Sequence, residues 1–227
     1  MNIKRATALV FSLLCMAAVF SACSAGSGPE GKYISVAATV FDRLHTGSEV
    51  EGFTLDLSKG GKGTFDIDGE TYDIEWSVKD GEISITNEQG TMTGEIEKDV
   101  IRLNDIGGSG MSIVFAREGS DAADPVNYLT DEEKLFVGAW KSDAVYDALG
   151  SDASDKVSPN ALTIDIRSDK TASVTFADAE PIEGRWSVFD DMGIMEDVNV
   201  TFTLKEDGTL SVNYVEKGQN LTFYCAQ

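Results

Sequence analysis

The chain is poor in the residues that build most catalytic centres, with one histidine and three cysteines among 227 residues. A Ser-His-Asp or Cys-His arrangement would have to use His45, which lies in the polar segment 41–47 without a nucleophile motif beside it. We therefore interpret His45 as a solvated residue of a loop or strand end. Zinc sites take three or four Cys or His ligands. The composition thus predicts no zinc site and no cofactor, and we assign no catalytic residue.

Cysteine is also too scarce for a disulfide framework. If residues 1–22 are removed, only Cys23 and Cys225 remain, and any modification of the Cys23 thiol leaves no second thiol for an intrachain disulfide. Cys225 lies in Leu221-Thr222-Phe223-Tyr224-Cys225, where alternate residues share one face of a strand. Because a free cysteine behaves as a small hydrophobe, we expect Cys225 to be a buried structural thiol.

Positive charge is scarce as well, since 18 Lys and Arg stand against 39 Asp and Glu, a net charge of −21. Loss of Lys4 and Arg5 on export would make the balance 16 − 39 = −23. A surface this acidic repels phosphate backbones and anionic headgroups, which are bound through Lys and Arg. We therefore expect no nucleic-acid partner and interpret the acidity as a solubility feature, with a cationic partner as the alternative.

The N-terminal apolar run is too short for a retained transmembrane helix, but it is organised like an export signal. A positive segment ending in Lys4-Arg5 precedes apolar residues 6–20, and small residues precede Cys23. Fifteen helical residues rise only about 22 Å, less than the roughly 30 Å of a bilayer core. This order predicts a signal peptide over residues 1–22.

Phe20-Ser21-Ala22-Cys23 resembles the lipobox of bacterial lipoprotein signal peptides, with Phe20 where that pattern prefers Leu. The resemblance implies that Cys23 is lipidated and anchors the chain to the cell membrane, on the extracytoplasmic side. Ordinary secretory cleavage, with Cys23 incidental, is the alternative. Residues 23–30 are rich in Gly and Ser and predict a flexible tether between the anchor and the first domain.

Beyond the tether, apolar and polar residues alternate nearly everywhere. Large apolar side chains fall on every second residue of Tyr72, Ile74, Trp76 and Val78, which places one face on a core and the other in water. Turns such as Asp68-Gly69 supply the positive φ that tight hairpins require. The pattern predicts an all-β protein of antiparallel strands that close into a barrel or pack as a sandwich.

The second half of the chain repeats the motifs of the first. The corresponding motifs are Gly31-Lys32-Tyr33 and Gly138-Ala139-Trp140, the segments 53–57 and 162–166, 75–78 and 185–188, and Phe115 and Phe223, at offsets of 107, 109, 110 and 108. The repeat predicts two domains of about seven to eight strands each, residues 31–117 and 138–227. A polar linker, residues 118–137, separates them.

The linker contains one helix signal. Thr130-Asp131-Glu132-Glu133 has the pattern of a capping box, in which the Thr130 hydroxyl and the Glu133 carboxylate satisfy each other's backbone N–H groups. This predicts a short helix through Phe136 that would plug an open end of the second domain. An acidic linker without fixed conformation is the alternative.

Each half resembles a lipocalin-like domain. In that superfamily a Gly-x-Trp motif opens the first strand and a basic residue of the last strand packs over the ring. Trp140 matches the first part of the pattern and Arg117 the second, whereas Tyr33 replaces the Trp of the first half and the second half ends in Gln227. The resemblance implies an antiparallel barrel with an interior. The whole arrangement also resembles lipoproteins common among Gram-positive gut bacteria.

The size and composition of each half favour a filled interior, because barrels of about eight strands hold side chains or one small ligand. The bulky side chains expected inside are Tyr72, Trp76, Phe115, Trp186, Phe202 and Phe223. Calcium is the one metal that suits an oxygen-rich chain, and its candidate ligands are Asp66 and Asp68, Asp190 and Asp191, and the acids of segment 152–155. We expect Asp66 and Asp68 to lie in a hairpin instead, and we predict no metal site.

Two classes of function remain open. The first is a non-enzymatic binding or interaction module, a monomer whose small ligand or protein partner is unknown, with recognition in the loops 44–51 and 147–160. The second is an extracytoplasmic hydrolase whose paired carboxylates meet across the domain boundary.

Overall fold

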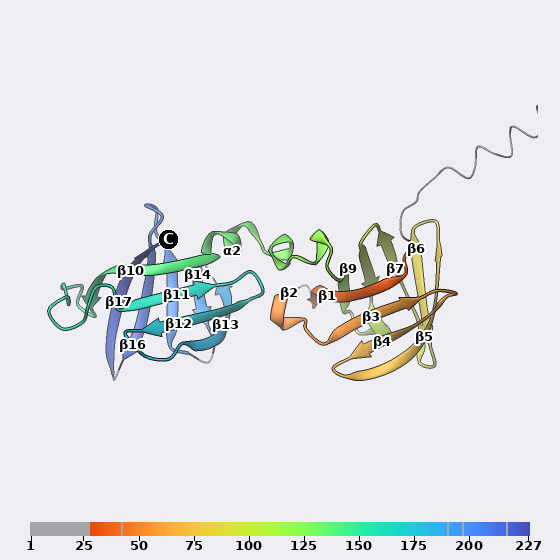
Figure 1. Ribbon diagram of the computed structural model, residues 1–227, viewed down its shortest axis with the longest axis horizontal. Coiled ribbons are helices and arrows are strands. Elements are labelled where there is room, and N and C mark those ends of the chain that lie inside the picture. The colour runs from red at the N-terminus through yellow and green to blue at the C-terminus, as the bar shows by residue number, and fades with distance from the viewer. Residues whose placement is uncertain (1–27, 42, 190, 197, 217) are drawn as a thin grey trace, which may run out of the picture.

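The computed structural model describes residues 28–227 except positions 42, 190, 197 and 217, and it consists of two antiparallel β-barrels in tandem (Figure 1). The predicted all-β fold of two barrels is confirmed. The signal peptide, Cys23 and Asp190 lie outside the described residues. In the part of the chain that is described, no helix has the length and hydrophobicity to cross a membrane.

Barrel 1 is a ring of eight strands. Its strands are β1 (Gly31–Val40), β3 (Phe53–Ser58), β4 (Lys62–Ile67), β5 (Glu70–Lys79), β6 (Glu82–Asn87), β7 (Gly90–Glu97), β8 (Val100–Asn104) and β9 (Ser112–Arg117). Neighbours pair in chain order, and β9 pairs back onto β1 to close the ring. The short strand β2 (Arg43–Thr46) extends the sheet beside the far end of β1.

Barrel 2 is closed in the same way. Its strands are β10 (Gly138–Asp147), β11 (Leu162–Ile166), β12 (Thr171–Phe176), β13 (Ile182–Phe189), β14 (Met192–Met195), β15 (Val200–Leu204), β16 (Leu210–Glu216) and β17 (Gln219–Ala226). The first strand of each barrel shifts register at a bulge, between Ser35 and Ala37 in β1 and between Ser142 and Ala144 in β10. The shared bulge, at an offset of 107, supports the duplication seen in the sequence.

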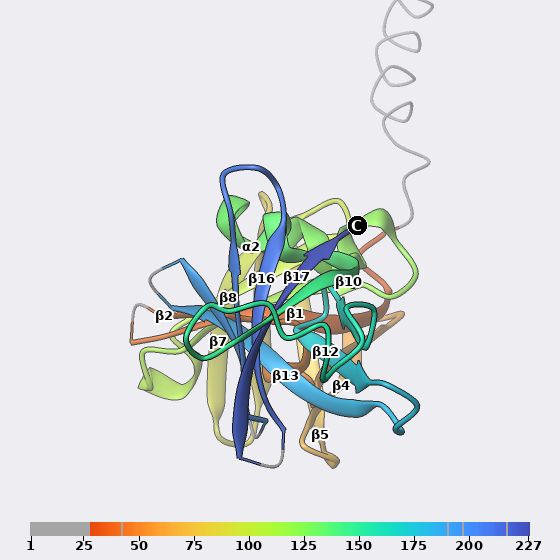
Figure 2. The same cartoon turned by 90° about the vertical axis from the view of Figure 1, so that its left-hand side faces the viewer.

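Each barrel has two distinct ends, which we name base and mouth. The base is the end where the first strand begins, at Gly31 in barrel 1 and Gly138 in barrel 2. The mouth is the opposite end, where β1 and β10 finish. Figures 1 and 2 together show the barrels one behind the other along the long axis of the molecule.

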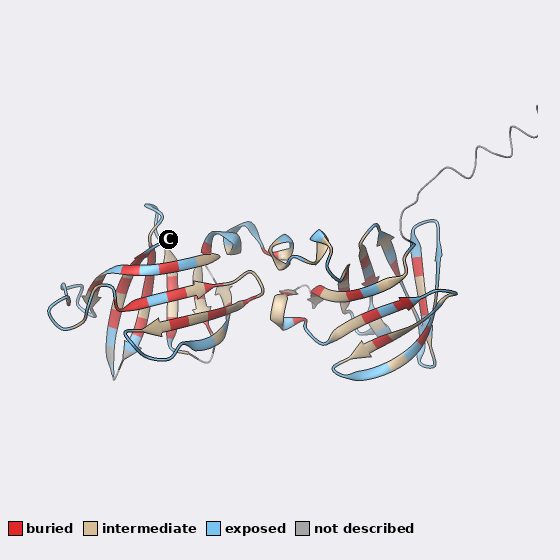
Figure 3. Ribbon diagram, in the orientation of Figure 1, coloured by how far each residue is buried: buried red, intermediate tan, exposed pale blue. Residues whose placement is uncertain are grey.

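The interior of each barrel is filled, as the alternation predicts, and buried positions recur on every second residue along the strands (Figure 3). Phe115, Trp186, Phe202 and Phe223 are fully buried. Tyr72 and Trp76 are only half-buried, because they lie near the two ends of β5. The prediction that both residues fill the interior is therefore only partly right.

The linker is ordered from end to end. It forms η4 (Asp121–Ala123), η5 (Pro125–Tyr128) and α2 (Asp131–Phe136). The predicted capping box of α2 is confirmed, since the Glu133 N–H donates to the Thr130 hydroxyl at 3.2 Å and the Thr130 N–H donates to the Glu133 carboxylate at 2.9 Å. Phe136 is buried in the core of barrel 2, with its ring centroid 5.4 Å from that of Phe202. Helix α2 thus plugs the base of barrel 2.

A direct contact joins the mouth of barrel 1 to the base of barrel 2. It is made by η2 (Gly47–Glu49), whose Ser48 N–H donates to the backbone carbonyl of Asp169 at 2.8 Å. Gly47 has φ +57°, and a Cβ at this position would lie 2.3 Å from the Asp169 carbonyl oxygen. Only glycine therefore fits this contact without displacing one barrel.

Candidate functional site

The mouth of barrel 1 holds a small cavity of about 110 Å³ between the ends of β4 to β7 and the segment η3 (Ile106–Gly108). Its apolar lining is formed by Phe65, Ile67, Tyr72, Met92 and Ile106, and Asn87 and Gln89 lie at its rim. The Tyr72 hydroxyl donates to the Glu70 carboxylate at 2.8 Å, and this bond raises the pKa of Tyr72. An apolar surface with a few polar groups at its edge is the usual composition of a ligand site.

The mouth of barrel 2 is closed. The loop between β10 and β11 folds over this end, where Ala153 and Ala161 are buried in the core and the Ala153 N–H donates to the Val145 carbonyl at 3.0 Å. Phe176 stacks on Tyr214 beneath the loop, with ring centroids 5.3 Å apart. Among the described residues, the mouth of barrel 1 thus offers space to a ligand, whereas the β10–β11 loop covers the mouth of barrel 2.

The two loops predicted to carry recognition have packing roles. Segment 44–51 contains η2, which contacts barrel 2, and its last turn places Val50 in the core of barrel 1. Segment 147–160 contributes Ala153 to the core of barrel 2. The cavity at the mouth of barrel 1 lies outside both loops, and no local sequence pattern indicated it.

The acidic candidates for calcium serve turns. The Asp66 carboxylate accepts from the Gly69 N–H at 3.0 Å and from the Thr71 hydroxyl at 2.9 Å, inside the predicted hairpin. Asp152 accepts from the Ser154 N–H at 2.8 Å, and this bond lowers the pKa of Asp152. Within residues 28–227, apart from the four undescribed positions, no group of three or more His, Cys, Asp or Glu side chains is arranged to hold a metal ion.

A carboxyl group that acts as a general acid needs a raised pKa. The described carboxyl groups with a shifted pKa are Glu75, Asp147, Asp152 and Asp207, and in all four the pKa is lowered. Hydrogen bonds are the main cause each time, from Lys62 to Glu75 and from nearby backbone or hydroxyl groups to the three aspartates. These carboxylates are therefore stabilised as anions and are unsuited to donating a proton.

His45 and Cys225 lie far apart in different barrels. His45 is half-exposed in β2, with its Nδ1 3.7 Å from the Glu49 carboxylate. Cys225 is fully buried in β17, and burial raises its pKa to about 12, with a smaller contribution from Asp143. A thiol with this pKa stays protonated at neutral pH, so it is a poor nucleophile. The predicted buried thiol is confirmed.

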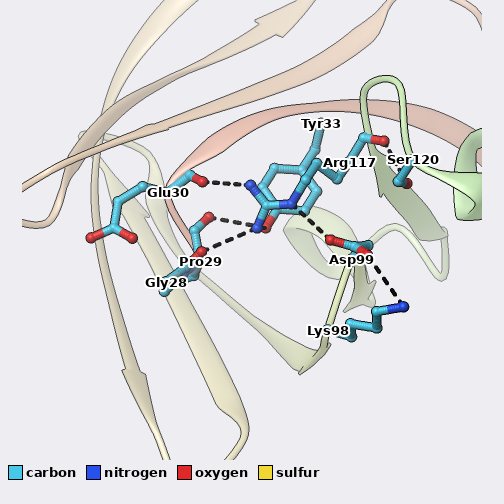
Figure 4. A network of polar contacts seen from close by, with 8 residues as sticks. All are labelled: Gly28, Pro29, Glu30, Tyr33, Lys98, Asp99, Arg117 and Ser120. Atoms are coloured by element: carbon cyan, nitrogen blue, oxygen red, sulfur yellow. Dashed lines mark hydrogen bonds and ion pairs between the residues drawn. The ribbon is translucent and has the colours of Figure 1, made fainter. Parts of the chain in front are cut away.

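A network of polar contacts organises the base of barrel 1 (Figure 4). The Arg117 guanidinium lies over the Tyr33 ring, 4.8 Å from its centroid, and donates to the Tyr33 hydroxyl at 2.7 Å and to the Asp99 carboxylate at 2.9 Å. It also donates to the backbone carbonyls of Gly28 and Glu30. The implied contact between a basic residue and the ring is thus present in the first half, with Tyr33 in place of Trp.

Barrel 2 has the same arrangement with different side chains. The Trp140 indole donates to the Phe136 carbonyl at 2.8 Å, just as the Tyr33 hydroxyl donates to the Pro29 carbonyl at 3.0 Å. Gln227 replaces Arg117, and its amide donates to the Val137 carbonyl at 3.3 Å. The sequence alone did not indicate that these side chains secure the residues preceding each first strand.

Strand register corrects one pair of the predicted repeat. In β1 Ser35 is opposite Phe115, and in β10 the corresponding Ser142 is opposite Cys225. The structural counterpart of Phe115 is therefore Cys225, at an offset of 110, and not Phe223. The error arose because a period-two pattern looks the same after a shift of two residues.

No family model matches the chain, and no curated protein matches it. Among solved structures, a lipocalin-like protein from Bacteroides uniformis is similar over 39% of this chain and 96% of that chain, with 18% sequence identity and a TM-score of 0.30. Strand order and ring closure show that the chain is a tandem of two eight-stranded antiparallel β-barrels.

Proposed function

We propose that the protein is a cell-envelope lipoprotein, anchored outside the cytoplasm through a lipid on Cys23, whose barrel 1 binds one apolar group of a small ligand or partner without catalysis. The cavity at the mouth of barrel 1 carries this proposal. The N-terminal pattern that ends at Cys23 supports the anchor.

The size of the cavity limits what it receives. Its volume of about 110 Å³ is far below the roughly 300 to 1,000 Å³ of pockets for drug-sized ligands. It therefore accommodates a group the size of one aliphatic or aromatic side chain. Met92 is suited to such a role, because its flexible thioether adapts to groups of different shape. The amides of Asn87 and Gln89 at the rim can hydrogen-bond the polar remainder of the ligand.

Filling the cavity tests the binding site. Trp at position 92 would occupy the space, so Met92→Trp should weaken binding of an apolar probe such as indole by about tenfold or more, which is about 1.4 kcal/mol. Met92→Leu conserves volume and is the matched control, with an expected change of less than about threefold. Binding is measured by chemical-shift titration of the chain from residue 23 onward. Equal binding by both variants would exclude this cavity as the site.

The anchor is tested separately, by mass spectrometry of the protein purified from its source. A mass increase on an N-terminal Cys23 is expected, and Cys23→Ser should release the protein from the membrane fraction. An unmodified N-terminus would support ordinary secretory cleavage. The same spectra, recorded under native conditions, would detect a co-purifying ligand. The hydrolase inferred as the alternative from the acidic sequence stays a prediction, and no observation favours it.

A further inference from the structure

The bases of the two barrels are built from corresponding parts of the chain but are covered differently. The bonds from Tyr33 to Pro29 and from Trp140 to Phe136 align the residues before β1 with those before β10 at an offset of 107. In barrel 2 these residues are helix α2, which plugs the base. In barrel 1 they are the end of the predicted tether.

Apolar side chains are only partly covered at the base of barrel 1, where residues 28–30, the described part of the segment before β1, form no counterpart of α2. Trp186 of barrel 2 is 1% exposed, with the Lys170 ammonium 4.6 Å from its ring centroid and paired with Glu133 of α2. The counterpart Trp76 is half-buried, and Val78, which follows it on the same face of β5, is 39% exposed. The Trp76 indole N–H donates to the Ser58 carbonyl, and the Trp186 indole N–H donates to the Arg167 carbonyl. Because Ser58 and Arg167 end corresponding strands or follow them directly, the two tryptophans occupy equivalent positions.

Charge is distributed unequally between the two ends of barrel 1. The segments at the base contain six basic and six acidic residues, a net charge of 6 − 6 = 0. These segments are residues 30–32, 58–62, 79–82, 97–100 and 117–118. The described segments at the mouth contain one basic and seven acidic residues, a net charge of 1 − 7 = −6. These segments are residues 43–52, 66–71, 86–91 and 104–112. In a strongly acidic chain, the base is thus a nearly neutral surface with Lys59, Lys79 and Lys98 in or beside its turns, and its Lys62 is paired with Glu75.

The chain enters barrel 1 at this same base. Arg117 holds the carbonyls of Gly28 and Glu30, and Tyr33 holds that of Pro29 (Figure 4). Cys23 lies only five residues before Gly28, a span of at most about 17 Å. A lipid on Cys23 would therefore keep the base of barrel 1 close to the bilayer.

We propose that the base of barrel 1 is a membrane-docking surface, an inference that rests on the proposed lipid anchor at Cys23. Trp76 and Val78 contact the headgroup region, where tryptophan is favoured, and the lysines of the turns lie at the rim, where their stems cover apolar surface and their ammonium groups face phosphates. The acidic mouth and barrel 2 then point away from the membrane.

Trp76 provides the test, because the other two tryptophans, Trp140 and Trp186, are buried. The chain from residue 23 onward is coupled through Cys23 to a maleimide lipid in vesicles, and the buried Cys225 should not react. Brominated lipids quench tryptophan at the headgroup boundary. We expect clear quenching in the wild-type protein and its loss in Trp76→Phe. Because the lipid is attached chemically, failure here is distinct from failure of lipidation in cells.

Charge variants provide a second measurement that does not depend on the folding of Trp76→Phe. Lys59→Glu with Lys79→Glu should reduce quenching at least about twofold on vesicles with anionic lipid, and less in high salt. Lys156→Glu with Lys205→Glu makes the same charge change on exposed lysines of barrel 2 and should leave quenching unchanged. Unquenched Trp76 in bound protein, or equal effects of both lysine pairs, would overturn the proposal and leave the base free for another partner.

Discussion

The two barrels share a framework and differ in how they are filled and closed. In barrel 1 the inward cross-strand pair is Ile83 and Gly94, and in barrel 2 the corresponding pair is Gly193 and Phe202. The large residue lies on the first strand of the pair in barrel 1 and on the second strand in barrel 2, and glycine takes the other position in each barrel. Volume-conserving exchanges of this kind are tolerated in cores. The interior has thus diverged by compensation at this pair, whereas the ends of the two barrels have diverged without it.

The largest expected effect comes from making the base of barrel 1 like that of barrel 2. Arg117→Gln removes the contact over Tyr33 and leaves the partly buried Asp99 carboxylate without its main partner. We expect a loss of about 3 kcal/mol in the free energy of unfolding of barrel 1, measured by urea denaturation.

The reverse change in barrel 2, Gln227→Arg, serves as the control, because no residue that corresponds to Asp99 is described beside Gln227. A change below about 0.5 kcal/mol is expected for it. If Arg117→Gln were equally mild, the network in Figure 4 would not stabilise the base.

A smaller effect is expected from disturbing the exchanged core pair. A Cβ at Gly193 would lie 1.8 Å from a ring carbon of Phe202, so Gly193→Ala should destabilise barrel 2 by about 2 kcal/mol through overpacking. Adding Phe202→Leu should restore part of the stability, since the two sites are in contact. Additive losses in the double variant, measured by thermal unfolding, would show that the pair is not coupled.

The smallest effect near neutral pH concerns the Cys225 thiol, and it grows in alkaline solution. Burial raises the pKa of Cys225 from 9.0 to about 12, so above pH 9 the thiol is deprotonated in the unfolded chain while the folded protein retains its proton. The stability that this provides is complete below pH 9 and is lost as the pH rises toward 12. Cys225→Ala should be less stable at pH 7 but should show a flatter decline above pH 9. If the stability of the two proteins declined in parallel above pH 9, the raised pKa of the Cys225 thiol would be contradicted.

Much of the fold follows from local chemistry. The alternation of apolar and polar residues predicted that Leu55, Ile85 and Phe115 are buried, and they are. Gly69 has the predicted positive φ, and Asp68 before it has a positive φ as well. The capping box at Thr130 is read from four consecutive residues. These signals succeed because each depends on neighbours in the chain.

The site depended on contacts that no local pattern encodes. Trp76 and Trp186 have the same sequence context, yet only Trp186 is buried, because burial depends on helix α2 lying over the strand end. The cavity beside Met92 is formed by residues of β4 to β7 and of η3 that are far apart in sequence. Asp99 and Lys170 gained roles only through partners distant in sequence, Arg117 and Glu133.

The contact of Gly47 and Ser48 with Asp169 has a mechanical consequence. A linker alone would let the barrels tumble as two particles, whereas a second point of attachment, far from the linker in sequence, restricts rotation about it. The molecule then behaves as a short rod. If the proposed lipid on Cys23 anchors one end of this rod, its far end would lie at a defined height, and the absent side chain of Gly47 would help to set how far barrel 2 extends from the membrane.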